Sequence, residues 1–335
     1  MGSTASAPSP ADTDQLAPLP YRSAEPITPE RLAAEKDPAA KAALKRRRAL
    51  EFPPAPEPLP EPVMDNHTHL DFPVLDDNAP ADLRDALARV SLKDALDVAA
   101  SVGVQGAVQV GCDLESSRFV VQAVKADERL LGAVAIHPND APALAEAGQL
   151  DAALAELEVL AAHPRVRAIG ETGLDYFRTE AQRQPQQQES FRKHLELAKR
   201  LDLALQIHDR DAHEDVVRIL LEQGAPSRVV FHCFSGDASL ARICREHGWY
   251  LSFSGTVTFK NSEGLREAAA LADPSLILVE TDAPFLTPHP FRGRPNASYL
   301  MPQTVRVLAE TRETELSRFC QQLSRNTEQV YGSWD

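Results

Sequence analysis

The sequence predicts an α/β protein of the (β/α)8 or TIM-barrel class. From Val63 onward, short apolar runs rich in β-branched residues alternate with segments of helical period, which indicates β/α units and a parallel sheet. Eight such runs occur, and eight units in about 270 residues match the size of one closed barrel. An open doubly wound sheet is the alternative, but the chain contains no Gly-x-Gly-x-x-Gly or Walker A sequence.

The expected strands are short, and a helical segment separates each from the next. Their residues are 63–66, 107–110, 132–136, 166–169, 203–207, 229–231, 250–253 and 276–279. The intervening segments have the spacing of amphipathic helices, since Phe191, Leu195 and Ala198 share one helical face, as do Val216 and Leu220. Strand and helix therefore alternate in the order that a barrel requires.

Residues 1–62 differ in composition from the rest of the chain. They hold 13 of the 26 prolines, and residues 52–62 are typical of an extended, polyproline-like linker. A helix is expected around residues 29–50, ending in the basic run from Lys45 to Arg48. This run could contact nucleic acid, but a run of four charges is more typical of a solvated face. We therefore expect a mostly disordered Pro-rich extension over residues 1–62 and one barrel domain over residues 63–335.

Composition and charge narrow the classes of protein. No apolar run reaches the roughly 18 residues of a membrane span, and the N-terminus lacks the basic and apolar regions of a secretory signal. The four cysteines form no Cys-x-x-Cys pair, which is typical of reduced thiols in a cytoplasmic protein. A formal net charge of −14 argues against loose adhesion to nucleic acid or anionic membranes, but it is compatible with a pocket that holds a few phosphates.

Ionisable and metal-binding side chains follow six of the eight expected strands. In a (β/α)8 barrel these strand ends meet at one rim, where active sites lie. In chain order the residues are His67 and His69, His137, Glu171 and Asp175, His208 and Arg210, His232, and Glu280 and Asp282.

Each of these residues, taken alone, has a simpler explanation. His208 and His232 alone would be hydrogen-bonded core histidines, Glu171 a salt-bridge partner, and Asp282 the cap of a turn. The barrel nevertheless brings four histidines and two carboxylates together, and buried imidazoles and carboxylates are costly without a compensating cation. We therefore predict a metal centre. His67 and His69, two residues apart on a strand, point to the same side and suit one cation.

The strings that carry these residues resemble the TatD family of metal-dependent DNases. The resemblance covers residues 63–331 in order, and no single string decides it. The strings are DNHTH (65–69), IHP (136–138), GETGLDY (170–176), IHDR (207–210), FHCFSG (231–236), SFSG (252–255), ETDAPFLTP (280–288) and RGRPN (292–296).

This resemblance implies an amidohydrolase-like barrel that binds two divalent metal ions and hydrolyses phosphodiester bonds in DNA, commonly as a 3′→5′ exonuclease. Imidazole ligands favour Zn or Mn, whereas the family suggests activity with Mg. Glu171 matches the bridging ligand. The implied metal ligands are His67, His69, Glu171, His208, His232 and Asp282.

Catalytic roles follow for Asp282, as the general base, and for Glu171. His137, Arg210, Lys260 and Arg292 are candidate contacts to substrate phosphates. Family members usually have Gly before and often His after the Ile-His-Pro string, where this chain has Ala135 and Asn139. The stretch over residues 71–91 is also longer than usual.

Other functions remain open at this point. The same barrel and metals serve ester and amide hydrolysis, including aminoacyl-tRNA deacylation, and a non-catalytic binding protein could keep the fold. The expected substrate is DNA, with RNA as an alternative. No membrane and no obligate protein partner is expected.

Overall fold

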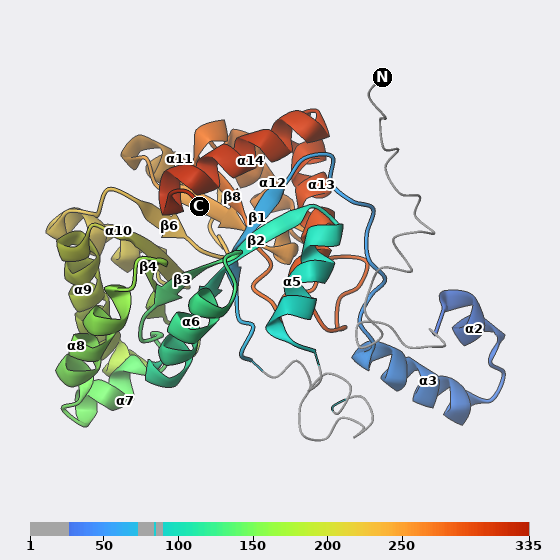
Figure 1. The fold of residues 1–335 in the computed structure, drawn as a ribbon, viewed down its shortest axis with the longest axis horizontal. Helices are drawn as coiled ribbons and strands as arrows, with labels where there is room; N and C mark the ends of the chain where they lie inside the picture. The colour runs from blue at the N-terminus through green and yellow to red at the C-terminus, as the bar shows by residue number, and fades with distance from the viewer. Residues whose placement is uncertain (1–26, 73–83, 85–89, 335) are drawn as a thin grey trace.

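The computed structural model describes residues 27–72, 84 and 90–334. Eight parallel strands form one sheet in the order β1 to β8, and helices surround it (Figure 1). The strands are β1 Val63–Thr68, β2 Val104–Val110, β3 Leu130–Val134, β4 Val166–Asp175, β5 Ala204–Arg210, β6 Val229–Phe231, β7 Tyr250–Phe253 and β8 Ile277–Val279. The predicted barrel is confirmed.

The barrel closes between its first and last strands at the rim. Thr68 forms a parallel bridge with Ala283, the amide of Asp282 donates to the His67 carbonyl at 2.9 Å, and the amide of His69 donates to the Ala283 carbonyl at 2.8 Å. The bonds that complete the barrel thus involve three of the predicted metal ligands.

The strand predictions hold with small shifts of boundary. The largest concerns β4, which was expected to end at residue 169 and continues to Asp175. Its extension pairs with β5, with Leu174 opposite Asp209 and Asp175 opposite Arg210. The polar residues after residue 169 therefore stay in the strand because β5 supplies hydrogen bonds to them. Pairing with a neighbouring strand cannot be inferred from the local sequence.

The helices cover the outside of the barrel and its far end. A cluster of buried residues between strands and helices forms most of the core, while a smaller cluster with Val108, Leu131, Ala168 and Val230 fills the interior. Among the described residues, no helix has both the length and the apolar character to cross a membrane.

The α-helices around the barrel are α5 Leu92–Ser101, α6 Leu114–Ala126, α7 Ala141–Glu146, α8 Leu150–Ala161, α9 Gln184–Leu201, α10 His213–Gln223, α11 Ala238–His247, α12 Glu263–Leu271, α13 Met301–Thr311 and α14 Leu316–Tyr331. Short 3-10 turns are η2 Ala181–Arg183, η3 Gly255–Thr258, η4 Pro274–Leu276 and η5 Ser298–Leu300.

The helix expected around residues 29–50 is in fact two helices, α2 Pro29–Ala34 and α3 Pro38–Leu50. Proline disfavours helical geometry in the residue before it and lacks an N–H to donate, so Pro38 starts a new helix. The side chain of Asp37 caps α3 by accepting from the amides of Ala39 and Ala40.

The segment of residues 51–62, here called the strap, is ordered against the barrel, whereas the prediction of a mostly disordered extension over residues 1–62 as a whole stays a prediction. Phe52 and Leu59 are buried against the barrel, and Tyr299 Oη donates to the Pro53 carbonyl at 2.6 Å. The Leu59 amide donates to the Val102 carbonyl at 3.0 Å. A proline-rich chain has few N–H groups to satisfy, so carbonyl bonds and two apolar anchors are enough to order it. Residues 1–26 lie outside the described range, and the division of the chain at residue 62 stays a prediction.

Candidate metal centre at the barrel rim

Four predicted ligands converge on one point at the rim. His67 Nε2 and His69 Nε2 lie 3.2 Å apart. Glu171 Oε2 lies 3.5 Å from His67 Nε2 and 3.8 Å from His69 Nε2. Asp282 Oδ1 lies 3.8 Å and 3.5 Å from the same two nitrogens. Donors about 2.0–2.1 Å from a tetrahedral ion lie ~3.3 Å from one another, so this spacing fits a single divalent cation.

The other oxygen of Glu171 faces a second group of histidines. Glu171 Oε1 lies 2.6 Å from His208 Nδ1, 3.1 Å from His232 Nε2 and 3.4 Å from His137 Nε2. One carboxylate therefore has an oxygen in each of two groups of nitrogen donors, which is the arrangement expected of a bridging ligand. His137 belongs to this second group, nearer to the metal ligands than a pure phosphate contact would be.

Hydrogen bonds orient His69 and His208, and an ion-pair contact lies behind His232. His69 Nδ1 donates to the Val110 carbonyl at 3.0 Å, which leaves Nε2 as the acceptor that faces the cluster. His208 Nε2 lies 3.2 Å from Asp175 Oδ2. His232 Nδ1 lies 2.9 Å from Glu280 Oε1. Carboxylates or carbonyls behind metal-binding histidines hold the ring orientation and raise the basicity of the ligand nitrogen.

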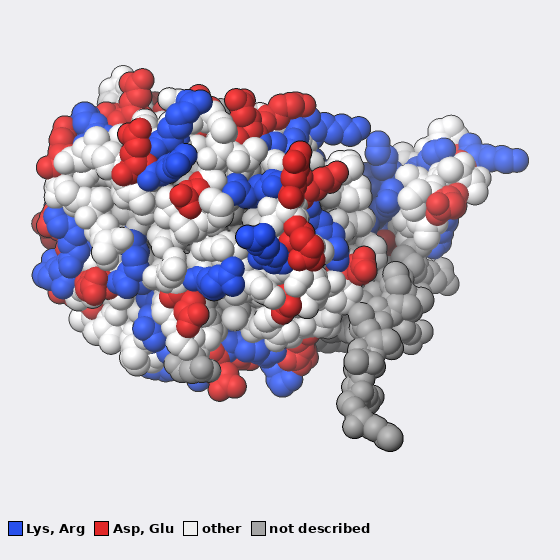
Figure 2. All heavy atoms as spheres, turned by 90° about the horizontal axis from the view of Figure 1, so that it is seen from above, with Lys and Arg blue, Asp and Glu red and all other residues white. Residues whose placement is uncertain are grey.

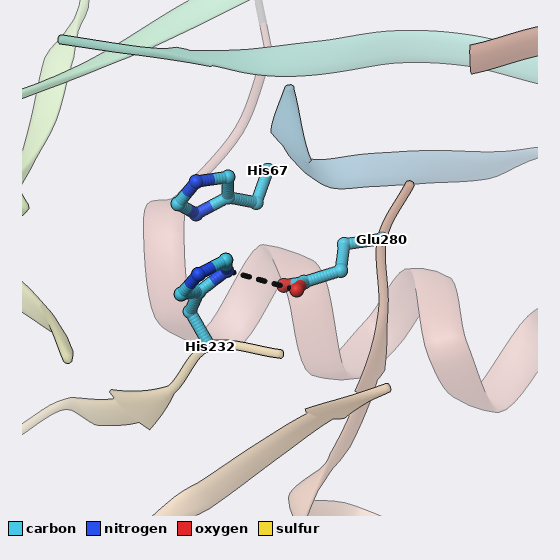
Figure 3. Close-up of side chains that lie close together, drawn as sticks. All are labelled: His67, His232 and Glu280. Carbon is cyan, nitrogen blue, oxygen red and sulfur yellow. Dashed lines mark ion pairs between the residues drawn. The ribbon is translucent and has the colours of Figure 1, made fainter. Parts of the chain in front are cut away.

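Figure 3 shows how Glu280 and His232 lie beneath His67. The His67 and His232 rings are stacked, with centroids 3.7 Å apart and an interplanar angle of 18°, and the Glu280 carboxylate points at His232. Glu280 is fully buried and also accepts from the Cys233 amide at 2.6 Å. Glu280 therefore contacts a predicted metal ligand in addition to the local backbone.

Electrostatics keep the carboxylates ionised. Burial alone raises the pKa of Glu171, but the charges of His232 and His137 outweigh it and hold that pKa well below its ordinary range. Burial also raises the pKa of Asp282, but the neighbouring His69 and His232 outweigh it when they are protonated and lower that pKa. Ionised carboxylates and nitrogen lone pairs are the forms that bind a cation.

The backbone of Asp282 is strained and is held in place by Thr281 and Asp65. Asp282 has a left-handed backbone with φ of 52°, a conformation that is uncommon outside glycine and often marks a functional constraint. The preceding residue, Thr281, bonds to buried Asp65. Oδ1 of Asp65 accepts from the Thr281 amide at 2.9 Å, and Oδ2 accepts from the Thr281 hydroxyl at 2.5 Å. Burial raises the pKa of Asp65 to about 6.

The cluster lines a cavity of about 690 Å³ at the rim. Of the four predicted substrate contacts, the structure brings two to this cavity, His137 and Arg210. Arg210 stacks on Phe177 with its guanidinium carbon 3.9 Å from the ring centroid. Lys260 and Arg292 are exposed and lie outside the described lining, with Arg292 stacked on Phe259 at 4.0 Å.

Sequence reasoning missed several residues of the site. Asp65 and Glu280 lie within two residues of predicted ligands, but their pairing with Thr281 and His232 is visible only in the folded chain. Phe72 stacks on His69 at 4.6 Å, and Cys112 Sγ lies 3.7 Å from Glu171 Oε2. Nothing in the sequence around Cys112 indicates that position. The long stretch noted over residues 71–91 lies largely outside the described residues.

The donors themselves fit a metal. His67 and His69 face each other through Nε2 atoms, and His69 uses its Nδ1 proton elsewhere, so its Nε2 offers a lone pair. Among the described atoms, His67 Nδ1 is buried without a hydrogen-bond partner. A set of imidazoles and carboxylates at this spacing is suited to a divalent transition metal.

A barrel with such a centre at its rim defines a metal-dependent hydrolase. The family model described as TatD related DNase matches residues 64–332, and the chain belongs to this family. The resemblance read from the sequence is therefore confirmed, while the roles of individual residues stay predictions.

Related proteins agree with this assignment. The chain is 44% identical over 274 residues to an uncharacterized metal-dependent hydrolase TatD of Mycobacterium tuberculosis, covering 81% of this chain and 98% of that protein. It is 34% identical over 270 residues to the uncharacterized metal-dependent hydrolase YabD of Bacillus subtilis, covering 80% and 98%. Among solved structures, YjjV, a TatD homologue from Escherichia coli K12, superposes with a TM-score of 0.68 at 28% identity, covering 81% of this chain and 98% of that one.

Proposed function

We propose that this protein hydrolyses phosphodiester bonds in DNA as a 3′→5′ exonuclease that uses two divalent metal ions. The observation that carries the proposal is the placement of Glu171, whose two oxygens each face a separate group of histidine nitrogens. Two neighbouring cations suit the attacking and leaving oxygens of a displacement at phosphorus. Membership of a family named for DNase activity supports the same substrate.

The ligands divide between two positions. His67, His69 and Asp282 would hold one ion, His208 and His232 the other, with Glu171 shared. Mg, Mn and Zn are the candidates, and the imidazole content favours Zn or Mn. When bound, the ions would polarise a phosphoryl oxygen and lower the pKa of the attacking water.

The chain's own residues would position the substrate and move the proton. Asp282 is ionised and lies at the cavity, so its carboxylate can accept the proton of the attacking water. Arg210 and His137 line the cavity and can hold non-bridging phosphate oxygens. The half-buried apolar side chains of Phe72 and Leu286 line the cavity and would limit the access of bulk water on one side of the site.

A nuclease assay tests the proposal. Single- and double-stranded DNA labelled at the 5′ end or at the 3′ end is incubated with purified protein and Mg, Mn or Zn in turn. A 3′→5′ exonuclease releases the 3′ label first as mononucleotide and shortens the 5′-labelled strand stepwise. RNA, carboxylic esters and aminoacyl-tRNA are parallel substrates. Faster turnover of esters than of any phosphodiester would overturn the proposed reaction.

We also propose DNA as the main macromolecular partner, with RNA as a second substrate, and the cytoplasm as the compartment. The four cysteines are all free thiols, which supports a reducing environment. Fractionation of cells with an antibody against the protein tests the compartment, and recovery outside the cytoplasm would contradict it.

A further inference from the structure

The most basic segment of this acidic protein is the helix α3. It carries five Lys or Arg among its thirteen residues and no acidic side chain, in a chain whose formal net charge is −14. None of its residues is buried, so the helix contributes little to the core. The lobe formed by α2 and α3 projects from the barrel, and Figure 2 shows Lys and Arg side chains gathered on it.

Among the described residues, three of the basic side chains of α3 have no acidic partner to neutralise them. Several surface cations of the barrel, such as Arg118, Lys193 and Arg200, are instead held in ion pairs with glutamates and aspartates. Within the part of the chain that the structure describes, Lys41, Lys45 and Arg46 are exposed and take part in no ion pair. Cations near a helix C-terminus also interact with the helix dipole, but that effect is confined to the last turn and leaves Lys41 and Lys45 unexplained.

The backbone that follows α3 is bonded to the loop after β8. Arg294 donates from Nε to the carbonyl of Glu51, the C-cap residue of α3, and from Nη2 to the carbonyl of Phe52, both at 2.7 Å. Burial and then the charge of Arg48 lower the pKa of Arg294, which reflects how near the basic run lies to this loop.

The same loop reaches into the active-site cavity. It begins directly after Asp282, and Phe285 and Leu286 line the cavity. Asn296 Nδ2 ties the two ends of the loop together, donating to the Phe285 carbonyl at 2.5 Å and to the Thr281 carbonyl at 3.0 Å. The strap and Arg294 therefore hold the basic helix beside the rim rather than at the far end of the barrel.

We propose that α3 is a docking surface for the phosphate backbone of the nucleic-acid substrate, beyond the nucleotide that is cleaved. This inference rests on the proposed function and extends it to a second contact region. A long polyanion is repelled by most of an acidic surface. A helix with three exposed cations, joined through Arg294 to the loop that lines the cavity, is a place where released counterions can offset that repulsion. The contact is to phosphates and is independent of base sequence.

The test compares two triple variants of the full-length, metal-loaded protein. Lys41→Gln/Lys45→Gln/Arg46→Gln removes three exposed charges of α3. Lys125→Gln/Arg245→Gln/Arg325→Gln removes three exposed charges from α6, α11 and α14, which lie away from α3 in Figure 1. Both variants change the net charge of the protein by the same amount. A difference between them therefore reports the effect of the α3 surface rather than the effect of overall charge. Substrates are a DNA strand of about 30 nucleotides, long enough for several phosphate contacts, and bis(p-nitrophenyl) phosphate, which is too short to reach α3.

The α3 variant should raise KM for the long strand about tenfold, leave its kcat unchanged, and reduce the slope of log KM against log salt by about 2, as expected for three lost contacts to single-stranded phosphates. Turnover of bis(p-nitrophenyl) phosphate should stay at the wild-type level in both variants. Equal KM and salt slope in the two variants, with wild-type DNA hydrolysis intact, would overturn the docking surface alone. Loss of binding to vesicles containing phosphatidylserine, with DNA kinetics unchanged, would also overturn it. If the wild-type protein cleaves bis(p-nitrophenyl) phosphate but no DNA, the proposed function would be overturned as well.

Discussion

Two buried histidine environments in this protein differ in how their ring nitrogens are satisfied. Between α9 and β3, His194 Nδ1 donates to the Ser190 carbonyl at 2.8 Å, and its Nε2 accepts from the Ile136 amide at 3.0 Å. At the rim, His67 and His69 turn Nε2 atoms toward each other at 3.2 Å and toward the carboxylates of Glu171 and Asp282.

The difference separates a structural histidine from a ligand. His194 is complete within the fold, because each nitrogen has a backbone partner of the right kind. At the rim, the Nε2 lone pair of His69 instead faces the Asp282 carboxylate, and two acceptors set against each other are costly without a cation. Burial alone therefore does not identify a metal site, and the direction of the lone pairs does.

Changing the rim should have the largest effect. Asp282→Asn keeps the size of the side chain and its coordinating carbonyl oxygen, but it removes the group that accepts a proton. We expect turnover of a phosphodiester to fall by on the order of 10²–10⁴-fold while the barrel stays folded. Steady-state kinetics with circular dichroism and elemental analysis measure this. The matched control, Asp151→Asn on the exposed face of α8, should keep wild-type turnover. Near-normal turnover of Asp282→Asn with full metal content would remove Asp282 from the role of base.

Protonation of His194 should lower the free energy of unfolding rather than the enzymatic activity. Burial lowers the pKa of His194 from 6.5 to about 4, because protonation of Nε2 would set one N–H against the Ile136 amide. Because the pKa of His194 is lower in the folded than in the unfolded state, its neutral form stabilises the folded protein above about pH 6.5. This contribution to the free energy of unfolding, about 3 kcal/mol in total, is lost as the pH falls toward 4. Urea unfolding of metal-free protein across this range measures the loss.

His194→Gln is the comparison for that experiment, since the amide oxygen of Gln can accept from Ile136 and does not titrate. The rim carboxylates also lose stability in acid, so only the difference between the two proteins isolates His194. If both lose the same stability between pH 7 and pH 4, His194 does not titrate in this way and the contrast with the rim fails.

Weakening the support of a ligand should have a smaller effect than removing the base. Glu280→Gln replaces the carboxylate behind His232 with a neutral amide, and we expect metal affinity to fall about 10- to 100-fold. Calorimetric titration of metal into the apo protein measures it independently of activity. The contacts of Glu280 with His232 and with the Cys233 amide are the reason for this expectation. Unchanged affinity would return Glu280 to a purely structural role.

The smallest effects are expected among the arginines. Arg210 lines the cavity and Arg292 lies outside its described lining, stacked on Phe259. Arg210→Ala should raise KM several-fold with little change in metal content, since an exposed phosphate contact contributes on the order of 1 kcal/mol. Arg292→Ala should raise it less. A larger KM effect for Arg292 would place the substrate path over the loop after β8 instead of over β5.

The sequence by itself determined the barrel and the identity of its rim residues. Alternation of apolar strands with helical segments is a local pattern, and so is the position of a histidine such as His67 or His232 at a strand end. The side-chain pairs were beyond its reach, because they join residues far apart in the chain: Asp65 with Thr281 across 216 positions, His208 with Glu171 across 37.

Only the tertiary structure decided which atoms of those residues meet. Barrel closure between β1 and β8 brings Asp282 to His69, and the pairing of β4 with β5 turns His208 so that Nδ1 meets Glu171 while Nε2 meets Asp175. The strap was likewise ordered by its surroundings, because its own prolines and apolar anchors indicate an extended chain but not the contacts with Val102, Arg294 and Tyr299 that hold it. Composition and periodicity act over a few residues, whereas these contacts depend on the register and curvature of the whole sheet.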